Sequence, residues 1–229
     1  MRFDTPMTNF NPGEIDRDVI RAMRRSYGEQ GLSEESVSAN PIKQFQNWLQ
    51  EAAANNFIVE PNAMVLSTMD DTGPTSRTVL LKEVNEFGFT FFTNYQSRKA
   101  EQISKNPNLS LLFPWYPMER QVIVLGVAAK ISETESADYF ATRPWSSQIG
   151  AWASTQSEPL SSRQELEKQW QLFADKYPEG SVVPKPPHWG GFVVTPHSIE
   201  FWQGRYSRLH DRLRYTRIGA NWEIQRIYP

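Results

Sequence analysis

The chain shows two hydrophobic periodicities, one after the other. Between Pro41 and Asn55, apolar residues recur at intervals of three and four and a proline stands in the first turn, which predicts an amphipathic helix that packs on a sheet. After this helix the period changes to two, in runs rich in β-branched and aromatic residues that turn sequences separate. These runs predict strands at residues 63–69, 75–84, 89–93, 109–115, 120–131, 191–195, 198–203, 208–215 and 222–227.

Three short helices are predicted between the strands, at residues 97–105, 133–142 and 162–176. Before the second of them, Ser132 and Glu135 have the spacing of a capping box, and Pro144 marks its end. The order of strands and turns favours an antiparallel meander closing toward a barrel, so we predict a mainly β fold with flanking helices. Residues 1–35 mix Pro, Gly, Asn, Ser and charge around one helical candidate at 16–27. We expect a flexible arm there and a single domain from 36 to 229.

Composition narrows the possible function classes. A chain of 229 residues has the length of one compact domain. It contains no cysteine, which excludes thiol nucleophiles, cysteine-ligated zinc, iron–sulfur clusters and disulfides. With 24 Lys and Arg against 26 Asp and Glu, the net charge of −2 argues against a nucleic-acid partner. No stretch approaches the roughly 20 apolar residues of a membrane span and residues 1–10 lack a signal-peptide pattern, so we expect a cytoplasmic protein without a membrane partner.

The common cofactor and metal motifs are missing from the sequence. There is no Gly-x-Gly, so neither the dinucleotide fingerprint nor a Walker-type loop is available. His188, His197 and His210 lack the short spacing of a metal-binding pair, and we predict no metal. What remains is a set of cations and hydroxyls suited to phosphate esters.

One candidate anion site lies in the predicted strand at 208–215. Strand alternation predicts Arg208, His210 and Arg212 on one face and Leu209 and Leu213 on the other. Such a face binds an anion or is the solvated outer face of an edge strand.

Two further candidates involve helices. Arg98 and Lys99 open the predicted helix at 97–105, where free backbone N–H groups and the helix dipole favour a phosphate. Tyr139 and Arg143 are four apart on the helix before Pro144, with Ser147 just beyond, and could bind a second phosphate. Ordinary surface cations and helix packing are the alternative for both segments.

Arg77 and Lys82 lie five positions apart in the predicted strand at 75–84. A regular strand sends their side chains to opposite faces, unless a bulge realigns them. Four neutral side chains, which are more often structural than functional, complete the set of candidates: Gln121, Gln156, Ser157 and Trp202.

Nine separated blocks occur in one order: RTVLLK at 77–82, FTNYQSRK at 92–99, LFPW at 112–115, ERQ at 119–121, RP at 143–144, SQIGAW at 147–152, QS at 156–157, EFWQ at 200–203 and RLHDR at 208–212. With these blocks the chain resembles the pyridoxine 5'-phosphate oxidase family, flavin enzymes of the split-barrel fold. The resemblance runs from residue 24 to residue 229. So many separated blocks in the same order make a chance resemblance implausible.

The resemblance implies two sets of binding residues. The first surrounds FMN and consists of Arg77, Thr78, Val79, Leu80, Leu81, Lys82, Phe92, Thr93, Arg98, Lys99, Gln121, Gln156, Ser157, Trp202 and Arg212. The second binds the substrate and consists of Arg24, Arg25, Ser26, Tyr27, Lys82, Tyr139, Arg143, Ser147, Arg208, Leu209 and His210. In these sets Arg98 and Lys99 meet the FMN phosphate. The implied catalytic residues, Arg208 and His210, lie over the pyridine ring of the substrate.

The family's activity is then the expected one. An FMN-dependent oxidase, a pyridoxal 5'-phosphate synthase of vitamin B6 salvage, converts pyridoxine 5'-phosphate and pyridoxamine 5'-phosphate to pyridoxal 5'-phosphate. O2 is the electron acceptor, H2O2 is the by-product, and the amine also releases NH3. The resemblance further implies a homodimer with FMN at the subunit interface.

Departures from the family pattern are small. Ser26 stands where relatives often have an acidic residue, Phe92 where many have Tyr, and residues 204–207 have a local sequence of their own. Two other functions stay open. A flavin oxidase of the phenazine-biosynthesis type shares the fold and the Arg-Leu-His ending, and a non-catalytic binder of flavin or pyridoxal phosphate would need many of the same residues.

Overall fold

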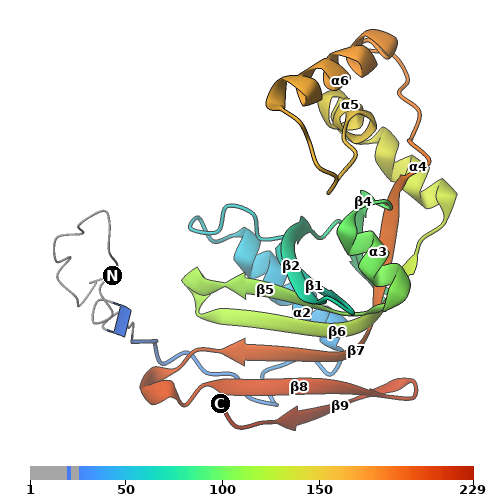
Figure 1. The fold of residues 1–229 in the computed structure, drawn as a ribbon. Helices are drawn as coiled ribbons and strands as arrows, with labels where there is room; N and C mark the ends of the chain where they lie inside the picture. Colours follow the sequence, from blue (N-terminus) through green and yellow to red (C-terminus); the bar gives the residue numbers. More distant parts are fainter. Residues whose placement is uncertain (1–19, 22–25) are drawn as a thin grey trace, which may run out of the picture.

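A computed structural model describes residues 20–21 and 26–229 of the chain, and within them it forms one antiparallel sheet with helices around it (Figure 1). The strands are β1 (Ala63–Asp70), β2 (Gly73–Leu80), β3 (Glu83–Asn85), β4 (Gly88–Asn94), β5 (Asn108–Trp115), β6 (Arg120–Lys130), β7 (Trp189–Gln203), β8 (Asp211–Ile218) and β9 (Asn221–Arg226). The helices are α2 (Pro41–Ala53), α3 (Arg98–Lys105), α4 (Glu133–Ala141), α5 (Trp145–Ala153) and α6 (Arg163–Lys176). Two 3-10 turns are η1 (Tyr116–Met118) and η2 (Tyr206–Arg208).

The sheet runs in the order β2-β1-β5-β6-β7-β4-β3, and every neighbouring pair is antiparallel. One edge of β7 is shared: its first half pairs with β4 and its second half with β8, which continues to β9. The end strands β2 and β3 do not pair with each other, so the sheet curls without closing. The mainly β, antiparallel, split-barrel class predicted from the sequence is confirmed.

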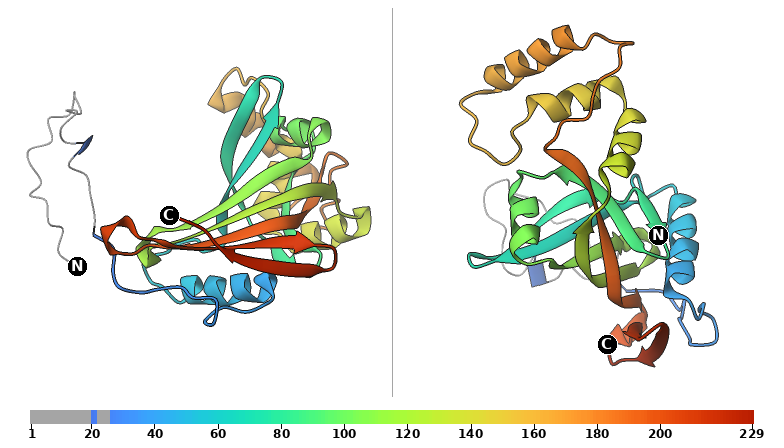
Figure 2. Two further views of the ribbon diagram at one scale, coloured as in Figure 1. Left: turned by 90° about the horizontal axis from the view of Figure 1, so that it is seen from below. Right: turned by 90° about the vertical axis from the view of Figure 1, so that its right-hand side faces the viewer.

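Helix α2 covers one face of the curled sheet, as Figure 2 shows. The Asn40 side chain caps it by accepting from the N–H groups of Ile42 and Lys43. Its Phe45 ring meets other core rings edge to face, and its Trp48 is buried beneath Arg120, whose guanidinium lies 4.4 Å from the indole centroid. The predicted amphipathic helix is confirmed.

Helices α4, α5 and α6 form a separate lobe beyond one end of the barrel (Figure 1). The lobe has a small core of its own around Phe140, Ile149 and Ala174, and the first residue of β7, Trp189, belongs to that core. The predicted capping box before α4 is present. In the described part of the chain, no helix is long and apolar enough to span a bilayer.

The helix α5 is absent from our prediction. The helix predicted at 133–142 does end before Pro144, at Ala141, but Pro144 is also the N-cap of a second helix. Proline suits the first positions of a helix because its missing N–H is not needed there and its φ is already helical. Ser147 is therefore in the first turn of α5 and not in a loop.

Two predicted strand boundaries are also wrong. The run at 75–84 is two strands, because the chain leaves the ladder at Leu81 and Lys82. The runs at 191–195 and 198–203 are one strand, β7, with a bulge at His197 opposite the Leu125–Gly126 step. Pro196 lies beside this bulge, where a proline is tolerated within a sheet.

The prediction for residues 208–215 is wrong in its first part. Arg208 belongs to turn η2, where Ser207 and Arg208 have φ values of 54° and 61°, and strand β8 begins only at Asp211. Arg208, His210 and Arg212 therefore do not share a strand face. A local alternation of charged and apolar residues cannot distinguish a strand from a turn followed by a strand.

Residues 26–40 lie along the C-terminal strands. Asp211 accepts from the Leu32 N–H at 3.0 Å, Arg226 donates to the Leu32 carbonyl at 2.8 Å, and the Tyr215 hydroxyl donates to the Ser38 carbonyl at 2.7 Å. The helical candidate at 16–27 lies largely outside the described residues. The division into an arm and a barrel domain stays a prediction.

Candidate active site

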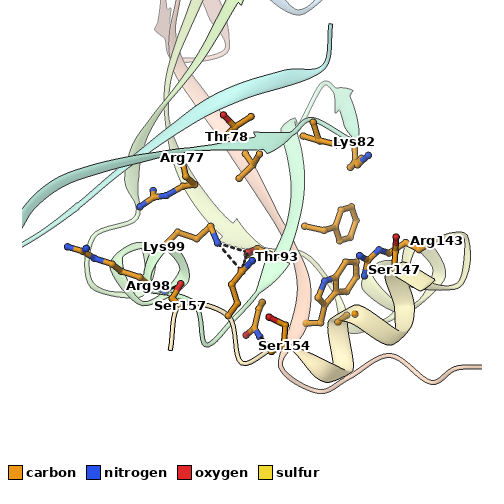
Figure 3. A pocket seen from close by; sticks show the side chains of 18 of the residues that line it. Arg77, Thr78, Lys82, Thr93, Arg98, Lys99, Arg143, Ser147, Ser154 and Ser157 are labelled. Carbon is orange, nitrogen blue, oxygen red and sulfur yellow. Dashed lines mark hydrogen bonds between the residues drawn. The ribbon is translucent and has the colours of Figure 1, made fainter. Parts of the chain in front are cut away.

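A cleft of about 1100 Å³ opens between the barrel and the helical lobe (Figure 3). Strand β2 and residue Lys82 line one wall, β4 and the start of α3 another, and the α4–α5 region with Trp189 and residues 154–157 the rest. β2 and β4 are far apart in the strand order, so it is the curl of the sheet that brings them to the same cavity. Two groups of cations occupy its opposite ends.

Arg77 is fixed at the first end by neutral groups. Its guanidinium donates to the Leu66 carbonyl at 3.2 Å and to the hydroxyls of Thr68 and Thr75. Gln102, buried on α3, accepts from both of these hydroxyls and so links α3 to the strands. Burial, followed by the charge of Arg98, lowers the pKa of Arg77.

Lys99 carries a buried ammonium group that pairs with no carboxylate of residues 20–21 or 26–229. Only 8% of the residue is exposed, and its Nζ donates to Thr93, Ser97 and Gln156 at 3.2, 3.2 and 2.9 Å. Burial, followed by the charge of Arg77, lowers its pKa to about 8. Hydroxyl and amide oxygens solvate the charge only in part, so an anion here would be strongly favoured.

The N-terminus of α3 points into the same end. Its N-cap, Ser97, makes no side-chain capping bond, and the Arg98 N–H instead donates to the Ser157 hydroxyl at 3.2 Å. Ser157 has a φ of 79°, an unfavourable conformation for a residue with a side chain, and this places its hydroxyl beside the helix start. A helix start, a buried ammonium and two guanidinium groups therefore converge on one region.

Arg143 dominates the other end. Its Nη1 is buried and has no hydrogen-bond partner in the described structure. The guanidinium carbon instead lies 4.7 Å from the ring centroid of Trp189 and 5.5 Å from that of Phe140. Burial lowers the pKa of Arg143, because the charged form loses water that nothing replaces. In Figure 3 Ser147 is drawn next to Arg143, and Lys82 lines the same end of the cleft from the strand side.

Three nearly parallel rings line the wall next to Arg143. Phe92 and Tyr139 stack with centroids 3.9 Å apart, and Trp189 stacks on Phe92 at 5.3 Å.

The end of strand β2 at Leu80 explains how Arg77 and Lys82 can serve one site. Both residues line this cleft although they are five positions apart. A strand end, and not a bulge, realigns them.

No ion pair involves any of these cations in the part of the chain that the structure describes. The set consists of Arg77, Lys82, Arg98, Lys99 and Arg143. Paired carboxylates neutralise most cations that are drawn together in a folded protein, so an unneutralised group in a cleft indicates an anionic ligand. The two separated groups indicate two such anions.

Several predicted site residues form a second cluster at the other end of β7. Trp202 lies opposite Gln121 on β6 and Arg212 on β8. The His210 and Tyr27 rings contact Trp202, with centroids 4.7 and 5.8 Å from it. β7 has 15 residues, and at about 3.3 Å each its ends lie roughly 45 Å apart along the strand. Within one chain this cluster does not reach the cleft.

The cluster has its own fixed contacts. Arg212 pairs with the buried Glu200 at 2.7 Å. The Arg205 N–H donates to Nδ1 of His210 at 3.1 Å, so this nitrogen is the acceptor and the ring proton is on Nε2. Burial, followed by the charge of Arg208, lowers the pKa of His210, which favours the same neutral form.

The remaining predicted residues are placed as follows. Arg208 and Leu209 are exposed next to the cluster, Ser26 is exposed, and Leu81 is buried in the barrel core. Arg24 and Arg25 lie outside the described residues. The cleft contains the other members of both predicted sets: Arg77, Thr78, Val79, Leu80, Lys82, Phe92, Thr93, Arg98, Lys99, Tyr139, Arg143, Ser147, Gln156 and Ser157.

The cleft is also lined by residues that sequence reasoning did not single out, among them Thr75, Ser154 and Trp189. Thr75 could have been found, because it shares a strand face with Arg77. Ser154 and Trp189 carry no local signal, since only the packing of the lobe on β7 brings them to the cavity. Among the described residues, no group of three His, Asp or Glu side chains could hold a metal ion.

Two family models match the sequence. One, described as pyridoxamine 5'-phosphate oxidase, matches residues 50–177, and another, described as the pyridoxine 5'-phosphate oxidase C-terminal dimerisation region, matches residues 189–229. A pyridoxine/pyridoxamine 5'-phosphate oxidase of Streptomyces avermitilis is 51% identical over 222 residues, covering 93% of this chain and 99% of the relative. An enzyme of the same name from Rubrobacter xylanophilus is 51% identical, with 93% and 98% covered.

Solved structures agree on the fold. PhzG of Burkholderia lata 383, in complex with tetrahydrophenazine-1-carboxylic acid, superposes with a TM-score of 0.81 at 28% identity, covering 88% of this chain and all of that one. A pyridoxamine 5'-phosphate oxidase-related FMN-binding protein of Nostoc punctiforme superposes with a TM-score of 0.67 at 16% identity, with 84% and 100% covered.

Proposed function

Because this chain belongs to the pyridoxamine 5'-phosphate oxidase family, we propose that it is an FMN-dependent oxidase that converts pyridoxine 5'-phosphate and pyridoxamine 5'-phosphate to pyridoxal 5'-phosphate. O2 is the electron acceptor, H2O2 is the by-product, and the amine substrate also releases NH3. The observation that carries the proposal is the cleft with an unneutralised cationic group at each end. Its volume of about 1100 Å³ exceeds the usual range for a single small ligand, and two phosphorylated rings lying together would use both ends.

The first end fits the phosphate of FMN. Lys99 has no carboxylate partner, the Arg98 N–H is at a helix start, and Arg77 is held rigidly by neutral oxygens. These residues, together with Thr93, Gln156 and Ser157, would hold the cofactor. Bound FMN supplies the acceptor of the two electrons removed from the substrate. The chain's own residues then have the tasks of binding and orientation, which explains why the sequence shows no nucleophile.

The second end fits the phosphate of the vitamin. Arg143 offers a buried N–H with no partner, and Lys82, Tyr139 and Ser147 lie around it. Hydrogen bonds between a guanidinium and a phosphate are charge-assisted and strong, and a dehydrated guanidinium has little water to lose on binding. Binding energy at the phosphate, which takes no part in the reaction, orients the ring and with it the reacting carbon on the neighbouring ring position.

In the proposed dimer, the second cluster of one subunit completes the active site in the cleft of its partner. The dimerisation-region model matches residues 189–229, which include Trp202, Arg208, His210 and Arg212. In a twofold dimer each subunit would then supply its cleft to one site and its cluster to the other. Neutral His210 would donate from Nε2, and exposed Arg208 would place its charge over the substrate ring.

Replacing Arg143 with alanine is expected to raise the KM for pyridoxine 5'-phosphate by on the order of 10- to 100-fold with a much smaller change in kcat, because the residue contacts only the remote phosphate. Steady-state kinetics on the FMN-loaded protein measure both constants. Arg163→Ala is the matched control, since Arg163 is an exposed arginine on α6 of the same lobe. An unchanged KM would contradict the assignment of this end.

FMN affinity is expected to fall as the pH rises through 8, because the free protein then loses the Lys99 charge. The sign follows from linkage: a bound phosphate raises the pKa of Lys99, so binding takes up a proton above pH 8 and weakens by up to about tenfold per pH unit. Titration of FMN fluorescence with the cofactor-free protein measures this. Lys99→Met should bind FMN weakly and without this pH dependence, whereas Lys105→Met, at the far end of α3, should behave like the wild type.

One assay distinguishes the proposed oxidase activity from the two alternatives, a phenazine-type oxidase and a non-catalytic carrier. The FMN-loaded protein is given each phosphorylated vitamer, and the absorbance of pyridoxal 5'-phosphate and the release of H2O2 are followed. Formation of both products supports the proposal. A loaded protein that oxidises neither vitamer is at most a carrier, and one that oxidises only reduced phenazine carboxylates belongs with PhzG, to which it is similar in fold.

A further inference from the structure

Trp189 lies where the barrel meets the helical lobe. Neither the sequence patterns nor the proposed binding sets give this residue a role. It is the first residue of β7, it is 6% exposed, and it belongs to the small core of the helical lobe. Its backbone is held independently of its ring, because its carbonyl accepts from Lys185 at 2.7 Å and the residue pairs with Asn94 on β4. The indole is thus a fixed surface, presented to the cleft from the barrel.

One residue of the second cationic end, Arg143, packs directly on this surface, and a second, Tyr139, packs on it through Phe92. The Arg143 guanidinium lies over the indole at 4.7 Å, and in the described structure its buried Nη1 has no hydrogen-bond partner that could hold it instead. Tyr139 is nearly parallel to the indole, at 7°, with Phe92 stacked against both rings. Arginine side chains have considerable rotamer freedom. Without a contact that holds its guanidinium, Arg143 would adopt several rotamers and would bind the phosphate less tightly.

We infer that Trp189 is a positioning residue for the substrate phosphate: its indole face holds Arg143 through a cation–π contact and, through Phe92, fixes the ring of Tyr139. The inference rests on the proposed function. It explains how the Arg143 guanidinium is held in place without a hydrogen-bond partner for Nη1 in the described structure. The π face stabilises the positive charge without occupying any N–H donor. All donors of Arg143 therefore stay available for the phosphate, which a carboxylate partner would not allow.

The test compares Trp189→Leu, which removes the aromatic face, with Trp189→Phe, which keeps a smaller one. Titration of the FMN-loaded protein with pyridoxal 5'-phosphate measures binding, and steady-state kinetics measure KM and kcat. Trp189→Leu is expected to weaken binding and raise KM on the order of 10-fold, with kcat within about twofold of the wild type, and Trp189→Phe to recover most of the loss. Arg143→Ala should lose as much, and adding Trp189→Leu to it should cost little more.

Trp170→Leu controls for damage to the lobe. Trp170 packs edge to face on Trp145 in the same small core, and the rings that Arg143 lies over in the described structure are those of Phe140 and Trp189. Wild-type binding by this variant is expected, and an equal loss in Trp170→Leu and Trp189→Leu would overturn the inference in favour of general packing. Unaltered binding by Trp189→Leu would overturn it directly.

Fluorinated tryptophans at position 189 keep the shape of the ring while weakening its π face, so they test the contact even where Trp189→Leu fails to fold. Affinity for pyridoxal 5'-phosphate that falls with each added fluorine supports the inference, and affinity independent of fluorination overturns it. The proposed function fails separately: a protein that binds pyridoxal 5'-phosphate through Arg143 and Trp189 but oxidises neither vitamer refutes the oxidase assignment and leaves the positioning role intact.

Discussion

Replacing Arg208 with alanine is expected to lower kcat/KM for pyridoxine 5'-phosphate by on the order of 100-fold or more, while FMN binding stays close to the wild-type value. Arg208 is exposed and lies outside the cleft of its own chain. Turn η2 nevertheless holds Ser207 and Arg208 at positive φ, a backbone conformation that costs free energy in residues with side chains. A functional reason for this strained backbone would be that the turn directs the Arg208 side chain toward a substrate in the partner's cleft.

The measurement for Arg208 needs a control for the general effect of removing a surface charge. Arg217→Ala serves, because Arg217 is exposed on β8 in the same C-terminal region. Its kcat/KM should match the wild type. An Arg208→Ala enzyme as active as the Arg217→Ala enzyme would remove Arg208 from the reaction.

A hybrid dimer of one Arg143→Ala subunit and one Arg208→Ala subunit is expected to recover about half of the wild-type kcat/KM, although each parent homodimer is impaired. In a twofold dimer with shared sites, one hybrid site combines both substitutions and the other has neither. Co-expression with two different tags and sequential purification isolate the hybrid, and steady-state kinetics on it give the result.

The reverse arrangement distinguishes shared sites from separate ones. A wild-type subunit paired with a subunit that carries both Arg143→Ala and Arg208→Ala should be impaired at both sites, because each site then contains one substitution. Sites built from a single chain would give the opposite pair of results: an impaired first hybrid and a half-active second one. The two hybrids together therefore leave no ambiguous outcome.

The fold was predictable where local pattern determines it. The period of α2 and the alternation of β1, β5 and β6 depend on which face of each element is buried, and the sequence records that directly. The errors fall where a boundary depends on distant contacts. Pro144 follows the end of α4 but is the N-cap of α5, and the turn at Ser207 precedes a strand whose first residue, Asp211, is bound to Leu32 and Arg226.

The site was predictable in its residue types more than in its geometry. Cations at a helix start and on one helix face identified Arg98, Lys99 and Arg143 as candidates, and all three line the cleft. Nothing local could show that Lys99 and Arg143 lack carboxylate partners, because that depends on the whole surrounding structure. Nor could it reveal Trp189, which reaches the cavity only because the lobe packs on the start of β7.

The length of β7 has a further consequence for the behaviour of the protein in solution. If its two ends contribute to different sites of a dimer, as proposed above, cofactor occupancy and subunit association are thermodynamically linked. FMN then strengthens association by the same factor by which association strengthens the retention of FMN. The fraction of FMN bound to the protein should therefore fall on dilution, and added FMN should favour the dimer over separated subunits.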